Sequence, residues 1–326
     1  MGELWVIGEP TPDGGLARIS AEVATLAREV GAQGSRQVVG IAIGAAPDAM
    51  AGELGRYVPA VRAITEPRAA EHAWSAIAAA QVAGLLGAAG EPPDLVLVGA
   101  GPDGRDMAGA LSALTGLGVL TSATAVAWTD AGPAVEMAPF GGKLLTTSGF
   151  TVGRGIVTVR PNVVTAVPAD TAGSVRADDG AASSLPAVRV LDRVSEAGAA
   201  APIEEAKIIV AGGRGVGGPD GFGLVQQLAD ELDGVVGATR AAVDSGWIAY
   251  SQQIGQTGKI VKPELYLALG ISGAIQHKVG MQTAGTIVAV NRDPDAPIAE
   301  FADLLVVGDL FEVGAALLER LRARPG

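Results

Sequence analysis

The sequence contains no cysteine, so it has no disulfide, thiolate metal site, iron–sulfur cluster or cysteine nucleophile. It contains only two histidines, and no set of His, Asp and Glu has the spacing of a metal site or of a Ser-His-Asp triad. Hydrolase and metalloenzyme functions are therefore poorly supported, and no metal site is predicted. Any redox chemistry must come from a bound cofactor.

Aromatic residues and positive charge are also scarce. Aromatics make up 4% of a chain that is 48% hydrophobic, so much of the apolar content is Ala and Val, which suits close-packed α/β layers. The formal net charge is -12, and no run is rich in Lys and Arg. Because nucleic-acid binding starts from a basic face, we predict no nucleic-acid partner.

No segment reads as a membrane span or a secretory signal. The N-terminus lacks a basic segment followed by an apolar run. The uncharged stretches 73–90 and 107–129 contain Ser, Gln or Thr, and the second is interrupted at Gly116 and Gly118, so both are better explained as core segments. We expect a soluble, cytoplasmic protein that is not embedded in a membrane.

The length of 326 residues favours two domains. In the first, buried strands alternate with helical patterns, which predicts a parallel sheet covered on both faces. The predicted strands are 3–8, 37–43, 94–99 and 118–127, and the predicted helices are 19–30, 48–57, 71–87 and 103–115. Short segments then predict an antiparallel extension over 134–167, an exposed loop over 170–186 and a last strand over 188–194.

Residues 195–206 are polar and alanine-rich and form the best linker candidate, so we place the domains at 1–200 and 201–326. The second domain repeats the alternation. Its predicted strands are 207–211, 235–238, 265–269, 286–290 and 304–307, and its predicted helices are 222–232, 272–281, 297–302 and 310–322. This order predicts an α/β fold with a doubly wound, Rossmann-like parallel sheet, which binds ligands beyond the carboxyl ends of its strands.

One stretch, 265–281, combines a buried strand with a helix start. The strand ends at Gly270, Ser272 is the predicted N-cap, and Ala274, Ile275 and Met281 supply apolar helix positions. A strand that turns through glycines into a helix leaves backbone N–H groups free, which predicts a phosphate seat. His277 follows closely enough to touch whatever the phosphate carries.

The loops that follow the strands of the second domain hold more glycine, arginine and amide groups than turns require, which is typical of a binding site. Arg214, Arg240 and His277 are candidates, although each could also be an ordinary surface residue. Asn291 and Asp309 come directly at strand ends and are candidates for ribityl, ribose or adenine contacts. The segment 252–259 adds hydroxyl, amide and amine groups, and its length indicates a function.

Two G-x-G-x-x-G matches follow predicted strands, and each is a weak signal among 47 glycines. In the match at 99–104, Pro102 and Asp103 favour a simple turn with an N-cap. After the match at 213–218, the position that carries an acidic residue in NAD-binding proteins holds Thr239 and Arg240. NAD is therefore disfavoured, whereas NADP stays open as a cofactor.

Four blocks in the second half then resemble one known family. The runs GATRAAVDSGW, QIGQTGKIVKPELYLALGISGAIQHKVGM, IVAVNRDPDAPI and FADLLVVGDLFEV closely resemble the C-terminal signature of the α subunit of electron-transferring flavoprotein. The resemblance covers roughly 207–313. The first domain fits that family in length and pattern only.

The resemblance implies a heterodimer of α and β subunits, with a non-covalent FAD in the C-terminal domain of α and a subunit-interface role for the first domain. It implies an electron carrier rather than an enzyme with its own substrate pocket. The carrier would pass electrons from acyl-CoA or similar dehydrogenases of fatty acid beta-oxidation to a membrane-bound quinone reductase. The β partner would carry AMP or a second FAD.

The resemblance also implies roles for individual residues. Arg214 and Thr239 would hold the FAD, and Arg240 would lie over or beside its ring. Gln256 and Thr257 would lie near the reactive edge of the flavin. The other implied contacts are the pyrophosphate and pyrimidine contacts of Ser272, Gly273, Ala274, Ile275, Gln276 and His277, the adenosine contacts of Asn291, Asp309 and Leu310, and the flanking Ile254 and Gly255.

Arg240, Thr257 and His277 are the residues expected to tune the flavin, since a cation at Arg240 or His277 would stabilise its reduced, negatively charged form. The sequence departs from the family at Thr239, where Ser is frequent, at Ala299, which replaces an aromatic residue, and at Lys278 with Val279. Two alternatives stay open: a self-contained NADP-dependent oxidoreductase built on 213–218 and Arg240, and an adenine-nucleotide-binding regulatory module.

Overall fold

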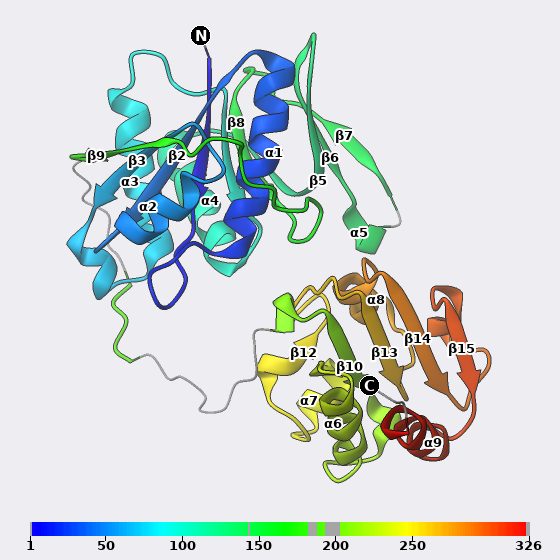
Figure 1. The fold of residues 1–326 in the computed structure, drawn as a ribbon. Coiled ribbons are helices and arrows are strands. Elements are labelled where there is room, and N and C mark those ends of the chain that lie inside the picture. Colours follow the sequence, from blue (N-terminus) through cyan, green and yellow to red (C-terminus); the bar gives the residue numbers. More distant parts are fainter. Residues whose placement is uncertain (1, 143, 182–187, 193–202, 324–326) are drawn as a thin grey trace. The chain divides into compact units, whose positions relative to one another are not determined.

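The structure is a computed structural model that describes residues 2–142, 144–181, 188–192 and 203–323. The chain divides into two compact units, Met1–Val194 and Ser195–Gly326, which are called here the N-terminal and C-terminal units (Figure 1). Residues 195–202 of the predicted linker 195–206 lie outside the described residues. No helix in the described part of the chain is long and apolar enough to cross a membrane.

The N-terminal unit is built on a single sheet with the strand order β7-β6-β5-β8-β4-β1-β2-β3-β9 among the described residues. Its strands are β1 (Glu3–Gly8), β2 (Gln37–Gly44), β3 (Ala60–Thr65), β4 (Leu95–Gly99), β5 (Val119–Thr129), β6 (Gly132–Met137), β7 (Thr146–Ser148), β8 (Gly155–Val159) and β9 (Ser174–Asp178). The pairs from β5 through β8, β4, β1, β2 and β3 to β9 are parallel, and β6 and β7 extend the sheet in antiparallel pairing.

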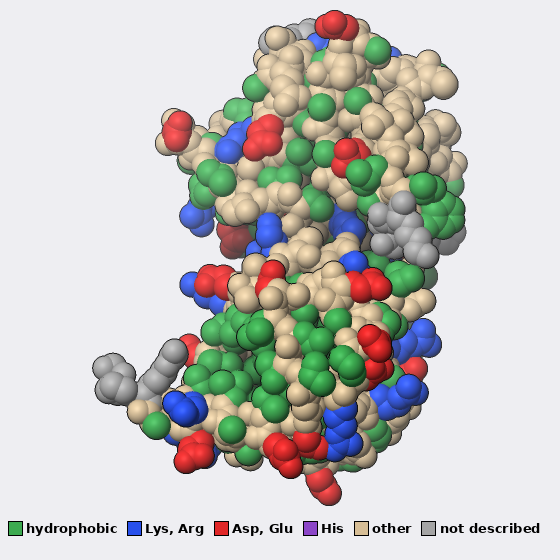
Figure 2. Space-filling view, turned by 90° about the vertical axis from the view of Figure 1, so that its right-hand side faces the viewer, with side chains coloured by type: hydrophobic (Ala, Val, Ile, Leu, Met, Phe, Trp, Pro, Cys, Tyr) green, Lys and Arg blue, Asp and Glu red, His purple; other side chains and the backbone are tan. Residues whose placement is uncertain are grey.

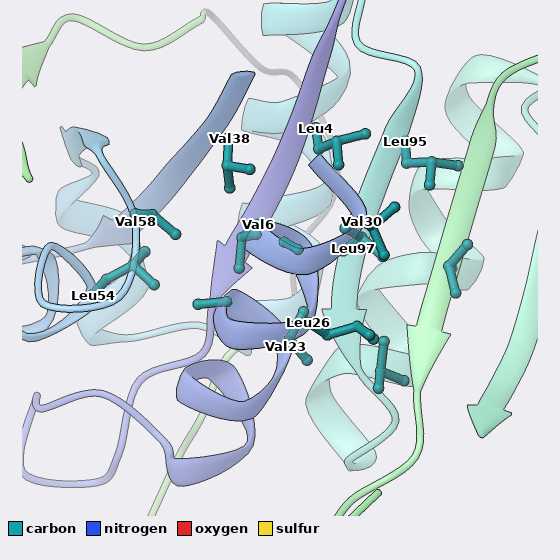
Figure 3. Close-up of a cluster of buried hydrophobic side chains, with 14 of the residues drawn as sticks. Leu4, Val6, Val23, Leu26, Val30, Val38, Leu54, Val58, Leu95 and Leu97 are labelled. Atoms are coloured by element: carbon teal, nitrogen blue, oxygen red, sulfur yellow. The ribbon is translucent and has the colours of Figure 1, made fainter. Parts of the chain in front are cut away.

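Helices cover both faces of this sheet, as predicted. They are α1 (Arg18–Gly34), α2 (Asp48–Leu54), α3 (Trp74–Ala88) and α4 (Pro102–Thr115), with the short η1 (Pro67–Ala70) and α5 (Pro139–Gly142). Strand β1 shows the alternation directly, because Leu4 and Val6 pack against α1 and α2 while Trp5 and Ile7 pack against α3 and α4. Figure 3 shows Leu4 and Val6 in one cluster with Val23, Leu26 and Val30 of α1.

Several predictions for this unit were incomplete or wrong. Strand β3 was not predicted, and β8, expected within the antiparallel extension, pairs in parallel between β4 and β5. The predicted loop 170–186 contains β9, which pairs in parallel with β3. The side chains of β9 are mostly exposed, so the sequence shows no alternation of apolar and polar residues there. In the predicted strand 188–194, residues 188–192 form only an isolated bridge at Arg189, and 193–194 lie outside the described residues.

The C-terminal unit contains a parallel sheet with the order β12-β11-β10-β13-β14-β15 in the described part of the chain, which confirms the doubly wound fold. Its strands are β10 (Ile208–Gly212), β11 (Val235–Thr239), β12 (Gln253–Ile254), β13 (Leu265–Leu269), β14 (Thr286–Asn291) and β15 (Leu304–Val307). Its helices are α6 (Phe222–Glu231), α7 (Arg240–Asp244), α8 (Ile275–Met281) and α9 (Leu310–Arg322), with the short η2 (Ile203–Glu205), η3 (Arg214–Val216), η4 (Tyr250–Gln252) and η5 (Pro297–Glu300).

The strand order sets the switch point and the exposed edge of this sheet. Strand β10 lies between β11 and β13, so the chain reverses its winding direction there, and the switch point is at the carboxyl ends of β10 and β13. At the far edge, β15 exposes Leu304 and Val307, and Figure 2 shows hydrophobic side chains gathered on this side of the C-terminal unit. Strand β12, which was not predicted, adds a further parallel pair beside β11.

Candidate cofactor site

A pocket of about 610 Å³ opens at the carboxyl ends of the C-terminal strands, where the switch-point rule predicts a ligand. Its volume is within the range of small-molecule sites. The loops after β10, β11, β12, β13 and β14 all contribute to its walls. The lining residues are Arg214, Gly215, Thr239, Arg240, Ala241, Asp244, Ile254, Gly255, Gln256, Thr257, Gly270, Ile271, Ser272, Gly273, Ala274, Gln276, His277 and Asn291.

The loops after β10 and β13 touch through their backbones at the base of this pocket. The Gly215 amide donates to the Gly270 carbonyl over 3.0 Å, and a Cβ atom added at Gly215 would lie 2.8 Å from the Cα of Gly270. A Cβ atom at Gly213 would collide with Gly270 in the same way, whereas Gly218 faces open space. The first two glycines of the second G-x-G-x-x-G match, Gly213 and Gly215, are therefore required, because a side chain at either position would prevent the contact between the two loops.

The helix after β13 begins later than predicted. Ser272 is not its N-cap, because α8 starts at Ile275, with Ala274 as an N-cap that makes no side-chain hydrogen bond. The reason is Gly273, whose φ of +83° is left-handed and cannot belong to a right-handed helix. The carbonyl of Ser272 accepts a hydrogen bond from the Ile298 amide instead, over 3.0 Å.

An unpartnered hydroxyl shows that the pocket fits a polar ligand. Thr239 is the N-cap residue of α7, yet its Oγ1 does not cap the helix; it is buried and has no hydrogen-bond partner among the described residues. Buried hydroxyls are nearly always satisfied, so this atom is suited to a ligand group. The first turn of α8, which no side chain caps, also offers backbone N–H groups at the pocket wall.

His277 lies in the wall of the pocket but is largely buried, with 6% of its surface exposed. Its Nδ1 lies 3.0 Å from the Ile254 carbonyl, which can only accept, so Nδ1 carries the proton. Its Nε2 therefore accepts a hydrogen bond from the Tyr266 hydroxyl over 2.9 Å.

Burial lowers the pKa of His277 to about 4, against the opposing effect of the Ile254 carbonyl, and burial also raises the pKa of Tyr266. His277 is thus uncharged at neutral pH, and the interpretation that it supplies a cation is wrong for this structure.

Arg240 and Arg214 supply the positive charge of the pocket. Arg240 opens α7, its side chain is 65% exposed, and its Nε lies 3.1 Å from Asp244 Oδ2 one turn later. Both members of this pair line the pocket, so a ligand in it would meet a paired arginine. Asp244 was not predicted as a site residue, although its spacing of four from Arg240 on a helix was visible in the sequence.

The segment 252–259 forms one wall, as its length suggested. The Gln256 amide donates to the Gln276 carbonyl over 2.7 Å, which ties the segment to α8. The Thr257 carbonyl accepts from the Tyr250 hydroxyl over 2.7 Å, and the Thr257 Oγ1 accepts from the Gln253 side chain over 3.2 Å. These bonds fix both predicted residues in the wall of the pocket.

Three predicted residues lie outside the pocket lining. Ile275 is 45% exposed, and Leu310 is buried in the core against α6. Asp309 caps α9 by accepting from the Phe311 amide over 2.7 Å, and it forms an ion pair with Arg292, which lowers the pKa of its carboxyl.

Asn291 does line the pocket, and its side chain braces the loops by donating to the Ile271 carbonyl over 2.9 Å. Sequence reasoning missed several small or apolar lining residues, which carry no chemical signal of their own. They are Gly215, Ala241, Gly270 and Ile271.

A parallel doubly wound sheet with a polar pocket at its switch point, and no metal-binding cluster among the described residues, defines a nucleotide-cofactor-binding α/β protein. The family description "Electron transfer flavoprotein domain" matches residues 4–185, and "Electron transfer flavoprotein FAD-binding domain" matches residues 202–282. The chain therefore belongs to the electron transfer flavoprotein family, as an alpha subunit, and its C-terminal unit contains the FAD-binding domain.

The curated relatives agree along the whole chain. The chain is 40% identical to the electron transfer flavoprotein subunit alpha of Mycobacterium leprae, over 100% of each chain. It is 42% identical to the subunit alpha of Mycobacterium tuberculosis (strain ATCC 25618 / H37Rv), also over 100% of each. With the subunit alpha of Bacillus subtilis it shares 37% identity over 97% of this chain and 96% of the other.

Gly273 and Gly217 allow a matched test of the turn that forms the pocket. Both have φ of +83°, but a Cβ atom at Gly273 would lie 2.6 Å from the Cα of Ile298, whereas Gly217 has nothing within 4 Å. Gly217→Ala should cost about 1 kcal/mol of unfolding free energy from backbone strain, and Gly273→Ala more than about 2 kcal/mol. Chemical unfolding and FAD retention measure both effects; equal losses would contradict the crowding at Gly273.

The buried His277 predicts a pH dependence of stability. Its pKa is about 4 in the folded state, below its ordinary value of 6.5, so the unfolded chain takes up a proton first as the pH falls. The free energy of unfolding should fall between about pH 6.5 and 4, by roughly 3 kcal/mol in total. Urea unfolding of the wild type and His277→Gln at pH 7 and pH 5 measures it, and the same loss in both would contradict the assignment.

Proposed function

We propose that this chain is the FAD-bearing subunit of a heterodimeric electron carrier. It takes electrons from acyl-CoA or similar dehydrogenases of fatty acid beta-oxidation and passes them to a membrane-bound quinone reductase. The observation that carries this proposal is the pocket at the β10–β13 switch point, most of whose lining lies inside the segment that matches the family's FAD-binding domain. The protein acts as a carrier and has no separate organic substrate of its own.

FAD, when bound, supplies the one- and two-electron chemistry. The chain supplies binding and electrostatics. The orphaned hydroxyl of Thr239 and the guanidinium of Arg214 hold the cofactor, and the backbone from Ser272 to Gln276 seats its pyrophosphate. Gln256 and Thr257, in the wall formed by 252–259, would contact the reactive part of the cofactor, and Asn291 would contact its adenosine part; all three line the pocket.

His277 and Arg240 have different electrostatic tasks in this proposal. Burial keeps His277 uncharged, and its hydrogen bonds to Tyr266 and Ile254 hold the ring in place, so it shapes the pocket without adding charge. Arg240 provides the positive charge that favours a reduced, anionic cofactor, and Asp244 moderates that charge by pairing with it. Asp309 and Leu310 support the adenosine side indirectly, through the start of α9.

The partner proposed for this chain is the β subunit of the same flavoprotein, which would carry AMP or a second FAD. The three relatives described above are each named as a subunit alpha, which supports a second subunit. We assign the subunit interface to the domain 1–200 and the cofactor to the domain 201–326, and we place the complex in the cytoplasm.

The NADP-dependent alternative has less support. It was built on the glycines at 213–218, and two of these are used for contact with Gly270. The regulatory-module alternative predicts a protein that binds a nucleotide but has no colour. The visible spectrum of the chain, purified after co-expression with the β subunit, therefore distinguishes the electron carrier from the regulatory module. A yellow complex that releases FAD on denaturation is expected; a colourless protein that FAD cannot reconstitute would overturn the proposal.

Arg240 should raise the reduction potential of the bound cofactor. Arg240→Ala should therefore lower the potential by on the order of tens of millivolts, because a single charge in a partly exposed site is strongly screened. Arg240→Lys keeps the charge and serves as the control, and Asp244→Asn, which removes the opposing carboxylate, should shift the potential upward. Spectroelectrochemical titration of the four proteins measures this; an unchanged potential in Arg240→Ala would remove Arg240 from the tuning role.

A further inference from the structure

The N-terminal unit has its own switch point, and a carboxyl group lies in it. Strand β1 lies between β2 and β4, so the winding direction reverses at the carboxyl end of β1. Glu9 directly follows β1 and is 5% exposed. Its backbone is anchored on α1, because its amide donates to the Ser20 hydroxyl and its carbonyl accepts from the Ala17 amide, each over 2.9 Å. The chain therefore holds this side chain in place.

The carboxyl of Glu9 is cradled by the three glycines of the first G-x-G-x-x-G match. A Cβ atom added at Gly99, where β4 ends, would collide with Glu9 Oε1. One added at Gly104 would lie 3.0 Å from Oε1, and one at Gly101 would lie 3.5 Å from Oε2. In dinucleotide-binding folds, glycines at this spacing allow the backbone to approach a pyrophosphate. In this unit the same glycines allow the backbone to approach the carboxyl of Glu9.

The start of α4 provides a positive electrostatic potential that could bind an anion, and so contributes to an anion seat. Gly101 is its N-cap residue, and glycine has no side chain that could cap the helix. The prediction of Asp103 as the N-cap is wrong, because the helix already begins at Pro102 and Asp103 lies in its first turn. The uncapped start of a helix is electropositive and favours an anion.

The oxygen that points into this seat has no ordinary partner. Glu9 Oε1 is buried and makes no hydrogen bond of normal geometry within the described residues. Burial and the neighbouring Asp103 raise the pKa of Glu9 to about 7, and the backbone of Gly99 and Gly104 partly opposes them. Among the described residues, no cation pairs with this oxygen, and three glycines surround its carboxyl group. The surroundings of this oxygen therefore resemble those of a bound phosphate oxygen more than those of a carboxylate in an ion pair.

We propose that the N-terminal unit contains a phosphate seat at its switch point, and that the side chain of Glu9 occupies it in place of the phosphate group of a nucleotide. Glu9 thereby closes this unit to nucleotides and leaves the pocket of the C-terminal unit as the site for the cofactor. The proposal concerns a site that is separate from the FAD pocket, so FAD content and phosphate binding report on the two independently.

Removal of the carboxyl should open the seat. In the FAD-loaded full chain, Glu9→Ala should bind inorganic phosphate saturably, at least about tenfold more tightly than the wild type, which corresponds to about 1.4 kcal/mol, and AMP should displace it. Glu9→Gln keeps the size of the side chain and should stay closed. The double variant Glu9→Ala with Gly101→Ala should close the seat again, since Gly101 has φ of −66° and accepts a methyl group without strain.

Phosphorus NMR titration with inorganic phosphate measures binding, while the flavin absorbance and thermal unfolding confirm that each variant is folded and loaded. A folded Glu9→Ala that binds phosphate no better than the wild type overturns the proposal. Equal binding by the single and double variants also overturns it, because the phosphate then lies elsewhere.

A second variant and a measurement on the wild type cover the case in which Glu9→Ala does not fold. Glu9→Ser vacates most of the same space, retains a hydroxyl for the cradle and should also bind phosphate. In the wild type, carbon NMR of labelled glutamate carboxyls should show one group that titrates near pH 7 and is lost in Glu9→Gln. Absence of such a group would place the Glu9 carboxyl outside the seat and overturn the proposal.

Discussion

The contact between the loops after β10 and β13 is the constraint on which the cofactor pocket depends. Gly215 and Gly270 approach so closely that neither has room for a side chain, and a backbone hydrogen bond joins them. This contact closes the base of the pocket and aligns the turn through Gly273 with the start of α8. The remaining walls, from β11, β12 and β14, then surround a space whose floor is backbone. A phosphate-bearing ligand can approach such a floor closely.

Burial decides which ionisable groups near the two switch points carry charge. His277 is neutral because burial removes its ring from water, and this outweighs its hydrogen bond to the Ile254 carbonyl, which favours the charged form. The positive charge of the pocket therefore comes from Arg214 and the pair of Arg240 with Asp244. Glu9 is shifted in the opposite direction for the same physical reason, since removal from water disfavours any charged form.

The two units apply one architecture in two ways. Each contains a run of parallel strands with helices on both faces and a switch point beside its first strand, and in the N-terminal unit β6 and β7 add antiparallel pairs. In the C-terminal unit the loops at that point leave a pocket, whereas in the N-terminal unit a side chain of the protein fills the glycine cradle. The same fold thus provides a cofactor site in the C-terminal unit. In the N-terminal unit, by our proposal, the side chain of Glu9 fills the corresponding phosphate site and excludes nucleotides.

The sequence by itself determined the two α/β halves, the strands from β10 to β15 apart from β12, and the place of the pocket beyond the strand ends, because apolar periodicity and the residues at strand ends are local signals. The roles of individual pocket residues came from the family resemblance and stay predictions. It did not reveal β9, whose exposed side chains carry no pattern, or the start of α8, which the backbone of Gly273 sets. Only the tertiary structure decided that His277 is neutral, that Asp244 pairs with Arg240 in the pocket, and that Glu9 lies in a glycine cradle. Burial and contacts between distant segments fix these properties, and neither is written in local sequence.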